Sequence, residues 1–274
     1  MLTRLATGFI GGALAIFIIY EGNWLFFLMI LLLALLGWHE FDGLARKLKG
    51  QIPVKVMSLW LVLYFTAFWF SNTKGTVLLT AFAFTWFMLR MVFRYGRLKP
   101  SDSALGCFGL LYVTIGFSAM LAIREGMVGS YLTAAFSEPQ LQPGRFLFFL
   151  LIFSTWASDT FAFFVGKAKG KTKLCPAISP GKTREGALGG FIGTVAVALF
   201  CAAIGHFSLL HGFVIGLIIA VMAPLGDLAE SILKRSAAVK DSGSLIPGHG
   251  GVLDRFDSLL LAAPAVYAYL ILIA

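Results

Sequence analysis

Acidic side chains are scarce in this chain of 274 residues, and they are unevenly placed. Of the 13 Asp and Glu residues, five fall in one stretch near the C-terminus. They are Asp227, Glu230, Asp241, Asp254 and Asp257. An ionisable side chain at membrane depth costs free energy and is a candidate functional residue by default. This stretch is therefore where we first expect chemistry.

The spacing of these polar residues predicts two helix faces. The first face repeats at i, i+3, i+4 and i+7, and consists of Asp227, Glu230, Ser231 and Lys234. The second repeats at i, i+3 and i+4, and consists of Asp254, Asp257 and Ser258. Carboxylates that converge from two helices suit Mg²⁺, which bridges them to substrate phosphates. The alternative is that these acids only neutralise the neighbouring bases, which are Lys234, Arg235, Lys240 and Arg255.

A basic, glycine-rich loop from Lys240 to Gly251 joins the two faces. Glycines such as Gly250 and Gly251 allow backbone N–H groups to approach an anion, and a helix N-terminus follows. The flanking bases suit a polyphosphate. His249 could donate a hydrogen bond to a phosphate, although a single loop histidine can also be purely structural.

A second basic loop runs from Lys167 to Arg184 and contains Ser179-Pro-Gly-Lys-Thr183. It lacks the first glycine of a Walker A motif, because Pro176 stands at that position, and we expect no β-strand before the helix. Ser179, Lys182 and Thr183 still precede a helix N-terminus and form a candidate anion site. The alternative is plain positive-inside bias. Asp159, upstream, is either functional or a helix-end acid paired with a loop lysine.

The elements that carry these residues are membrane helices. Hydrophobic residues make up 59% of the chain and charged residues 13%, which excludes a soluble enzyme, a disordered chain and a disulfide scaffold. Unbroken apolar runs predict an all-α polytopic fold with about nine spanning helices. Their expected ranges are 3–20, 23–41, 54–71, 76–93, 104–123, 146–165, 187–207, 209–223 with a polar extension, and 252–274.

The basic residues predict the orientation of the helices. With the N-terminus in the cytoplasm, 19 of the 22 Lys and Arg residues fall on the cytoplasmic side and only Lys74, Arg124 and Arg145 fall opposite. The C-terminus then lies on the other side. The net charge of +9 is therefore explained by topology, and no nucleic-acid partner is expected.

The helices are expected to fall into two regions. Residues 1–100 hold the first four helices, and residues 101–274 hold the last five with the catalytic loops. Small residues at Gly186 and Gly190, and again at Gly189 and Gly193, predict close helix contact near the site, although glycine is common in membrane helices.

The last polar stretch resembles the signature of the phosphatidate cytidylyltransferases, also called CDP-diacylglycerol synthases. The matching residues are Ser231, Leu233, Lys234, Arg235, Lys240, Asp241, Gly243, Ile246, Pro247, His249, Gly250, Gly251, Val252, Asp254, Arg255, Phe256 and Asp257. Ser158-Asp159 and the run from Ser179 to Gly186 also resemble the family, except that a lysine is common where this chain has Gly181.

The resemblance implies a reaction in which CTP and phosphatidic acid give CDP-diacylglycerol and pyrophosphate. It implies Mg²⁺ as cofactor, with a second cation as a further expectation. Asp227 and Asp254 would be the first metal ligands, with Asp257 and Glu230 as further candidates. It also implies a homodimer in the lipid bilayer of a bacterial inner membrane, with the active site facing the cytoplasm.

Roles for the remaining residues follow from the same resemblance. The catalytic group would consist of Asp227, Asp254, Lys234, Arg235, Lys240, Asp241, His249, Arg255 and Asp257. The substrate-binding group would consist of Asp159, Ser179, Lys182, Thr183, Ser231, Gly250 and Gly251.

Two other functions fit part of the pattern. A secondary transporter also uses intramembrane acids and a kinked helix, but its site lies near the midplane between repeated halves, and no repeat is visible here. A CTP-dependent lipid kinase would use the same nucleotide but would add phosphate to its product instead of CMP.

Overall fold

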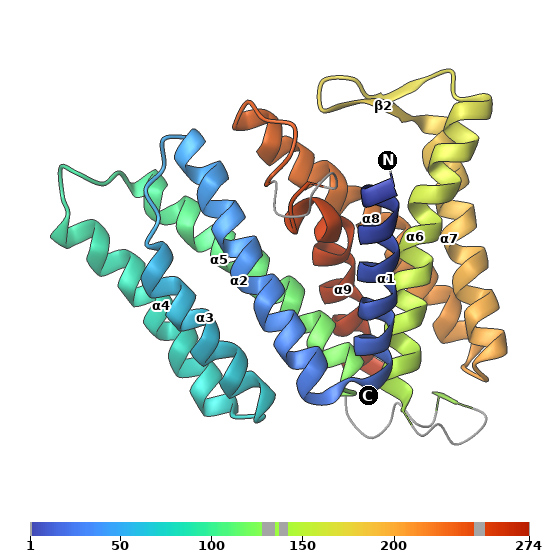
Figure 1. Cartoon of the computed structure of the whole chain (residues 1–274), viewed down its shortest axis with the longest axis horizontal. Helices are drawn as coiled ribbons and strands as arrows, with labels where there is room; N and C mark the ends of the chain where they lie inside the picture. The colour runs from blue at the N-terminus through green and yellow to red at the C-terminus, as the bar shows by residue number, and fades with distance from the viewer. Residues whose placement is uncertain (1, 128–134, 137–141, 244–249, 274) are drawn as a thin grey trace. The chain divides into compact units, whose positions relative to one another are not determined.

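The computed structural model describes residues 2–127, 135–136, 142–243 and 250–273, with side chains from residue 11 onward (Figure 1). Nine helices occur in this part of the chain. They are α1 (Leu2–Glu21), α2 (Asn23–Lys47), α3 (Val54–Trp69), α4 (Thr73–Phe93), α5 (Pro100–Arg124), α6 (Pro143–Lys169), α7 (Arg184–Ile204), α8 (Leu209–Ser236) and α9 (Leu253–Ile273).

The helical, multi-pass character predicted from composition is confirmed. Within the described residues, seven helices are long and apolar enough to cross a membrane. The described part of α1 and the 16-residue α3 are shorter apolar helices. Large apolar side chains remain exposed on the long helices, such as Leu78 of α4 at 70% and Leu272 of α9 at 83%. Such exposure fits a lipid-facing surface in a multi-pass membrane protein.

The chain divides into two compact units. Unit 1 comprises residues 1–118 and 233–255, and unit 2 comprises residues 119–232 and 256–274. Helices α8 and α9 each contribute residues to both units. The predicted polar extension of the eighth helix is confirmed, because α8 continues past Pro224 to Ser236 without a break.

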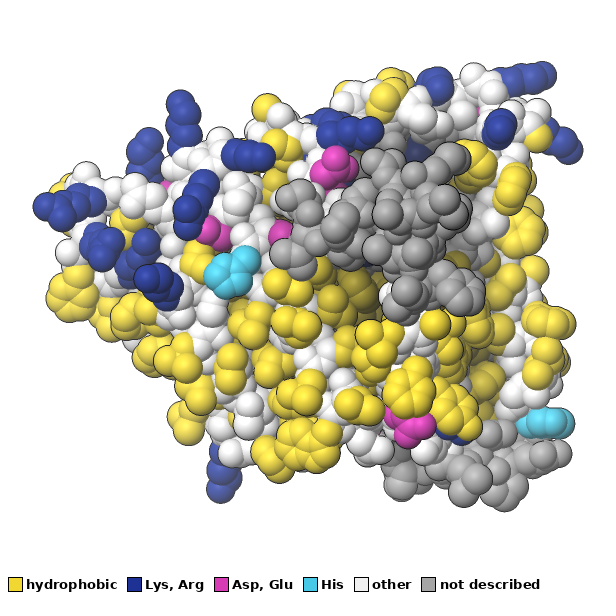
Figure 2. Space-filling view, viewed as in Figure 1, with side chains coloured by type: hydrophobic (Ala, Val, Ile, Leu, Met, Phe, Trp, Pro, Cys, Tyr) yellow, Lys and Arg dark blue, Asp and Glu magenta, His cyan; other side chains and the backbone are white. Residues whose placement is uncertain are grey.

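Unit 1 contains an antiparallel arrangement of α2, α3 and α4, in which α3 packs beside both of the others (Figure 1). Its core includes the large buried side chains of Trp38, Phe41 and Phe65. Figure 2 shows Lys and Arg side chains gathered over one end of these helices, above a broad hydrophobic surface. This segregation within the unit is what the positive-inside rule produces.

Unit 2 is organised around the contact between α6 and α7, which lie side by side (Figure 1). A Cβ atom at Gly186 would lie 2.7 Å from the carbonyl oxygen of Ala162, and one at Gly190 would lie 2.8 Å from that of Ser158. The backbones therefore meet closely at these glycines. The prediction of close helix contact from the small-residue spacing is confirmed.

A two-stranded antiparallel hairpin joins these two helices. Strand β1 (Lys173–Cys175) pairs with β2 (Ser179–Thr183), and α7 begins at the next residue. The expectation that no strand precedes this helix is wrong. The strand contains Pro180 and Gly181 and has no apolar alternation, so the sequence carried no strand signal, and pairing with β1 supplies the order instead.

Adding a methyl group at Gly190 should destabilise the protein. Gly190→Ala would push a Cβ atom against backbone, which costs about 1–3 kcal/mol in a packed site. Gly43→Ala is the matched control, because nothing lies within 4 Å of a Cβ at that helical glycine. We expect thermal unfolding in detergent to show a lowered Tm for Gly190→Ala only. Equal melting of the two variants would contradict the close contact.

Candidate functional site

Unit 2 contains a cavity of about 570 Å³ lined by α6, the hairpin, α7 and α8. The polar residues among those that line it are Ser158, Asp159, Lys167, Ser179, Lys182, Thr183 and Asp227. Five of these residues were predicted at the site from the sequence: Asp159, Ser179, Lys182, Thr183 and Asp227. Residues separated by almost 70 positions therefore meet in one cavity.

A close ion pair stands at this cavity. The Nζ atom of Lys182 lies 2.6 Å from Oδ2 of Asp227, and about a quarter of each side chain is exposed. The other carboxylate oxygen, Oδ1, accepts a hydrogen bond of 3.3 Å from the hydroxyl of Ser231, one helical turn further along α8. This contact confirms that Asp227 and Ser231 share a helix face, as the spacing predicts.

Asp159 contributes a second carboxylate from α6. It lines the same cavity, and the charges of Asp227 and Lys182 both reach it, one repelling and one attracting. The cavity thus holds two carboxylates near one lysine. A metal cation could take the place of the lysine ammonium beside these carboxylates. Mg²⁺ binds through one or two carboxylates together with waters and substrate phosphates. Asp159 and Asp227 fit that requirement.

The hairpin that carries Lys182 is held to the start of α7. The hydroxyl of Thr183 accepts the backbone N–H of Gly186 at 3.1 Å and caps the helix. The carboxylate of Glu185 accepts the N–H groups of Lys171 and Thr172 at 3.1 and 3.2 Å. These bonds hold both ends of the hairpin, so Lys182 is presented from a braced element.

A second group of predicted residues lies in unit 1. The Nζ atom of Lys234 is 2.6 Å from Oδ1 of Asp254. The other oxygen of Asp254 accepts three hydrogen bonds of 2.8 Å, from the backbone and hydroxyl of Ser242 and from the N–H of Gly251. Asp254 thus binds Ser242 and Gly251, which lie near opposite ends of the loop. Both of its carboxylate oxygens already have donors.

Glu40 is the residue at this second group that sequence reasoning missed. It lies in α2, is 8% exposed, and its carboxylate accepts the N–H groups of Val252 and Leu253 at 2.8 and 2.9 Å. The hydroxyl oxygen of Ser242 also lies 3.3 Å from this carboxylate, so its single proton is shared between Glu40 and the nearer Asp254. A carboxylate at this position satisfies the N–H groups that begin α9 and also opposes the positive end of the helix.

The structure explains why glycine stands at three positions of this loop. A Cβ at Gly243 would lie 2.6 Å from the Glu40 carboxylate, and one at Gly251 would lie 2.5 Å from it. Gly250 has a positive φ of 84°, which favours glycine. We expected these N–H groups to approach a substrate anion. The N–H of Gly251 instead binds the protein's own Asp254.

The remaining predicted residues occupy varied positions. Arg235, Lys240, Asp241 and Arg255 are exposed, whereas Glu230 is completely buried and does not line the cavity. Asp257 accepts the N–H of Ser258 at 2.6 Å, and its carbonyl oxygen lies against Gly226, where α8 and α9 pack closely. His249 lies outside the described residues.

The carboxylates differ in how well they fit a metal ion. Among the described residues, no three His, Cys, Asp or Glu side chains gather into a complete metal cage. A cation at Asp254 would have to displace Lys234 or the loop N–H groups. At Asp227 it would displace one lysine from an accessible oxygen, and Asp159 is already nearby. The cavity of unit 2 is the better fit.

Comparison with known proteins places the whole chain in one group. The family described as the cytidylyltransferase family matches residues 2–273. The chain belongs to this family. A phosphatidate cytidylyltransferase from Synechocystis sp. is 34% identical, with 98% of this chain and 96% of the relative covered. One from Bacillus subtilis is 30% identical over 99% and 98%, and one from Helicobacter pylori is 33% identical over 98% and 91%.

One signal in the sequence of this cytidylyltransferase could have revealed Glu40. It lies inside the expected membrane helix 23–41, and an acid inside such a helix is the same signal that marks Asp159. Its partners lie 212 and 213 residues away, so no local pattern could name them.

Removing the Glu40 carboxylate should loosen the start of α9. Glu40→Ala leaves two buried N–H groups unsatisfied, each at a cost of about 1–3 kcal/mol. Hydrogen exchange should therefore accelerate in peptides covering residues 250–256. Asp42→Ala is the matched control, since Asp42 is also buried in α2 but pairs with Arg46 instead. Unchanged exchange in Glu40→Ala would overturn the assignment.

Proposed function

We propose that this chain is a phosphatidate cytidylyltransferase, which makes CDP-diacylglycerol and pyrophosphate from CTP and phosphatidic acid. The observation that carries the proposal is the cavity in which Asp159, Lys182 and Asp227 meet, in a chain of the cytidylyltransferase family. The substrate class comes from the relatives in Synechocystis, Bacillus and Helicobacter, which are phosphatidate cytidylyltransferases.

The reaction requires little acid–base chemistry. An ionised phosphate oxygen of the lipid attacks the α-phosphorus of CTP and forms the new P–O bond. The bond from the α-phosphorus to the oxygen that bridges to the β-phosphate breaks, and pyrophosphate leaves with the electron pair. The barrier comes from bringing two anions together in line, so positioning and charge compensation are what the protein must supply.

The residues of the cavity can supply both. Lys182 is already paired with a carboxylate, and it can transfer that interaction to a phosphate oxygen when nucleotide enters. Ser179 and Thr183 lie beside it and offer hydroxyl donors. Mg²⁺ held by Asp227 and Asp159 would supply further neutralisation of phosphate charge. Asp254 and Glu40 would act by holding the signature loop and the start of α9 in shape.

The membrane setting fits the substrates. Phosphatidic acid resides in the bilayer, and CTP is dissolved in the cytoplasm, so the polar residues should face the cytoplasm with the N-terminus on the same side. We further propose that the protein is a homodimer in a bacterial inner membrane. The transporter and the lipid kinase receive no support from the family match.

Neutralising Asp227 should abolish the reaction. Asp227→Asn removes the carboxylate that holds Lys182, so we expect the product of a labelled-CTP assay with phosphatidic acid to fall by at least about 100-fold, comparable to losing a key charge-stabilising group. Lys171→Gln is the control, because this exposed lysine precedes β1 and does not line the cavity. The product should gain the mass of CMP. Full activity of Asp227→Asn, or a product that gains only phosphate, would refute the proposal.

Metal binding should distinguish the two aspartates. In electron paramagnetic resonance titrations with Mn²⁺ as the probe, Asp227→Asn should weaken binding about 10-fold or more, since it removes a direct carboxylate ligand. Asp254→Asn should leave Mn²⁺ affinity nearly unchanged while accelerating hydrogen exchange in the loop, because its oxygens already hold Lys234 and Gly251. The reverse pattern would make Asp254 the metal ligand.

A further inference from the structure

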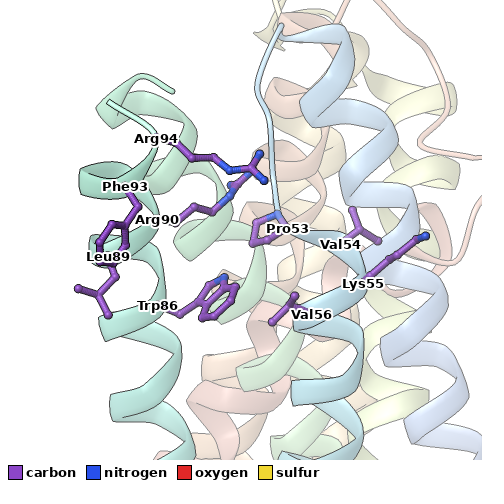
Figure 3. Close-up of a pocket in the computed structure, with 9 residues that line it drawn as sticks. All are labelled: Pro53, Val54, Lys55, Val56, Trp86, Leu89, Arg90, Phe93 and Arg94. Atoms are coloured by element: carbon purple, nitrogen blue, oxygen red, sulfur yellow. The ribbon is translucent and has the colours of Figure 1, made fainter. Parts of the chain in front are cut away.

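Unit 1 contains a separate cavity of about 510 Å³ between the start of α3 and the last turns of α4 (Figure 3). None of the residues assigned above to the reaction lines it. Its walls include Val56, Trp86, Leu89, Arg90, Phe93 and Arg94. The cavity therefore combines two guanidinium groups with a largely apolar surface.

The two arginines are placed without a nearby acid that pairs with them. Arg90 donates from Nη1 to the carbonyl oxygen of Gln51 at 2.8 Å, which fixes its position. The Arg94 guanidinium forms no hydrogen bond or ion pair within the described part of the chain, and its charge repels that of Arg90. Asp102 attracts Arg90 from a distance, but its carboxylate accepts the N–H groups of Gln51 and Lys99. The pair retains a net positive charge.

Further donors face the same space. The indole Nε1 of Trp86 is buried and has no hydrogen-bond partner among the described residues. Figure 3 shows this nitrogen on the side of the ring toward Pro53, with both guanidinium groups extending in that direction. The first turn of α3 also lines the cavity, and its cap, Pro53, supplies no side-chain hydrogen bond. An anion here would meet guanidinium, indole and backbone N–H donors together.

The surroundings select the kind of anion. Phe93 is 81% exposed, and Leu89 and Val56 are also exposed on helices whose surfaces suit lipid. Arginine and tryptophan at helix ends lie at the depth of lipid headgroups. We propose that this cavity binds the phosphate headgroup of an anionic glycerophospholipid, whose acyl chain lies along Val56 and Leu89. A free phosphate would leave the apolar walls unused. The inference does not depend on the proposed catalytic function.

Contact quenching of Trp86 tests the proposal with the full-length protein in neutral detergent. The probe is phosphatidylglycerol brominated on its acyl chain, which is anionic but is not the proposed substrate. Quenching is measured in the wild type and in Trp86→Phe, and the difference between the two is the quenching of Trp86 itself. About 0.3 M salt screens charges that lie more than about 6 Å from the lipid. We expect saturable quenching by this lipid and none above background by brominated phosphatidylcholine.

Two matched variants decide the role of the arginine. Arg94→Gln should lower the affinity for brominated phosphatidylglycerol at least about 10-fold, since a hydrogen bond between charged groups is lost. Arg97→Gln, which removes an exposed charge outside the cavity, should have no effect. Arg94→Lys should fall between them, because it keeps the charge and loses the planar fork.

Three results would overturn the inference. Equal effects of Arg94→Gln and Arg97→Gln would mean that only general surface charge attracts lipid. Equal quenching by brominated phosphatidylcholine would mean an apolar groove without anion recognition. Displacement of the lipid by glycerol 3-phosphate or inorganic phosphate at similar concentration would mean that the site takes a free phosphate.

Discussion

The buried carboxylate of Glu40 at the start of α9 is the interaction on which the signature loop depends. It joins the second helix of the chain to the last one, and the glycines of the loop pack directly against it. A charge buried in an apolar unit is costly unless donors surround it. Here two backbone N–H groups and a hydroxyl do so, and the same bonds satisfy a helix end that would otherwise be unpaired.

The aspartates of both units follow the same constraint. Asp227 and Asp254 each stand 2.6 Å from a lysine, and each also accepts a hydrogen bond from a serine of its own surroundings. In a chain with so few charges, the fold supplies each of these carboxylates with a partner of opposite charge. The difference lies in access. Asp227 faces a cavity, whereas Asp254 is enclosed by loop donors, and this separates a residue suited to a cation from one suited to holding shape.

Some of the basic residues in unit 1 line a cavity. Those at the ends of α2, α3 and α4 fit the topology rule, yet Arg90 and Arg94 are also turned into a cavity with a buried indole N–H. Charge at a membrane border is inexpensive, because headgroups and water solvate it. A protein that must carry such charge for topology can therefore use part of it for binding.

The sequence by itself determined the apolar helices, the shared face of Asp227 and Ser231, the close contact at Gly186 and Gly190, and the family signature. Each depends on spacing within one segment, which helical periodicity makes readable. Only the tertiary structure decided that Glu40 caps α9, that a strand carries Lys182, and that Asp254 binds its own loop. Those outcomes depend on partners brought together by folding, up to 213 residues apart, and residue spacing holds no information about such distant pairs.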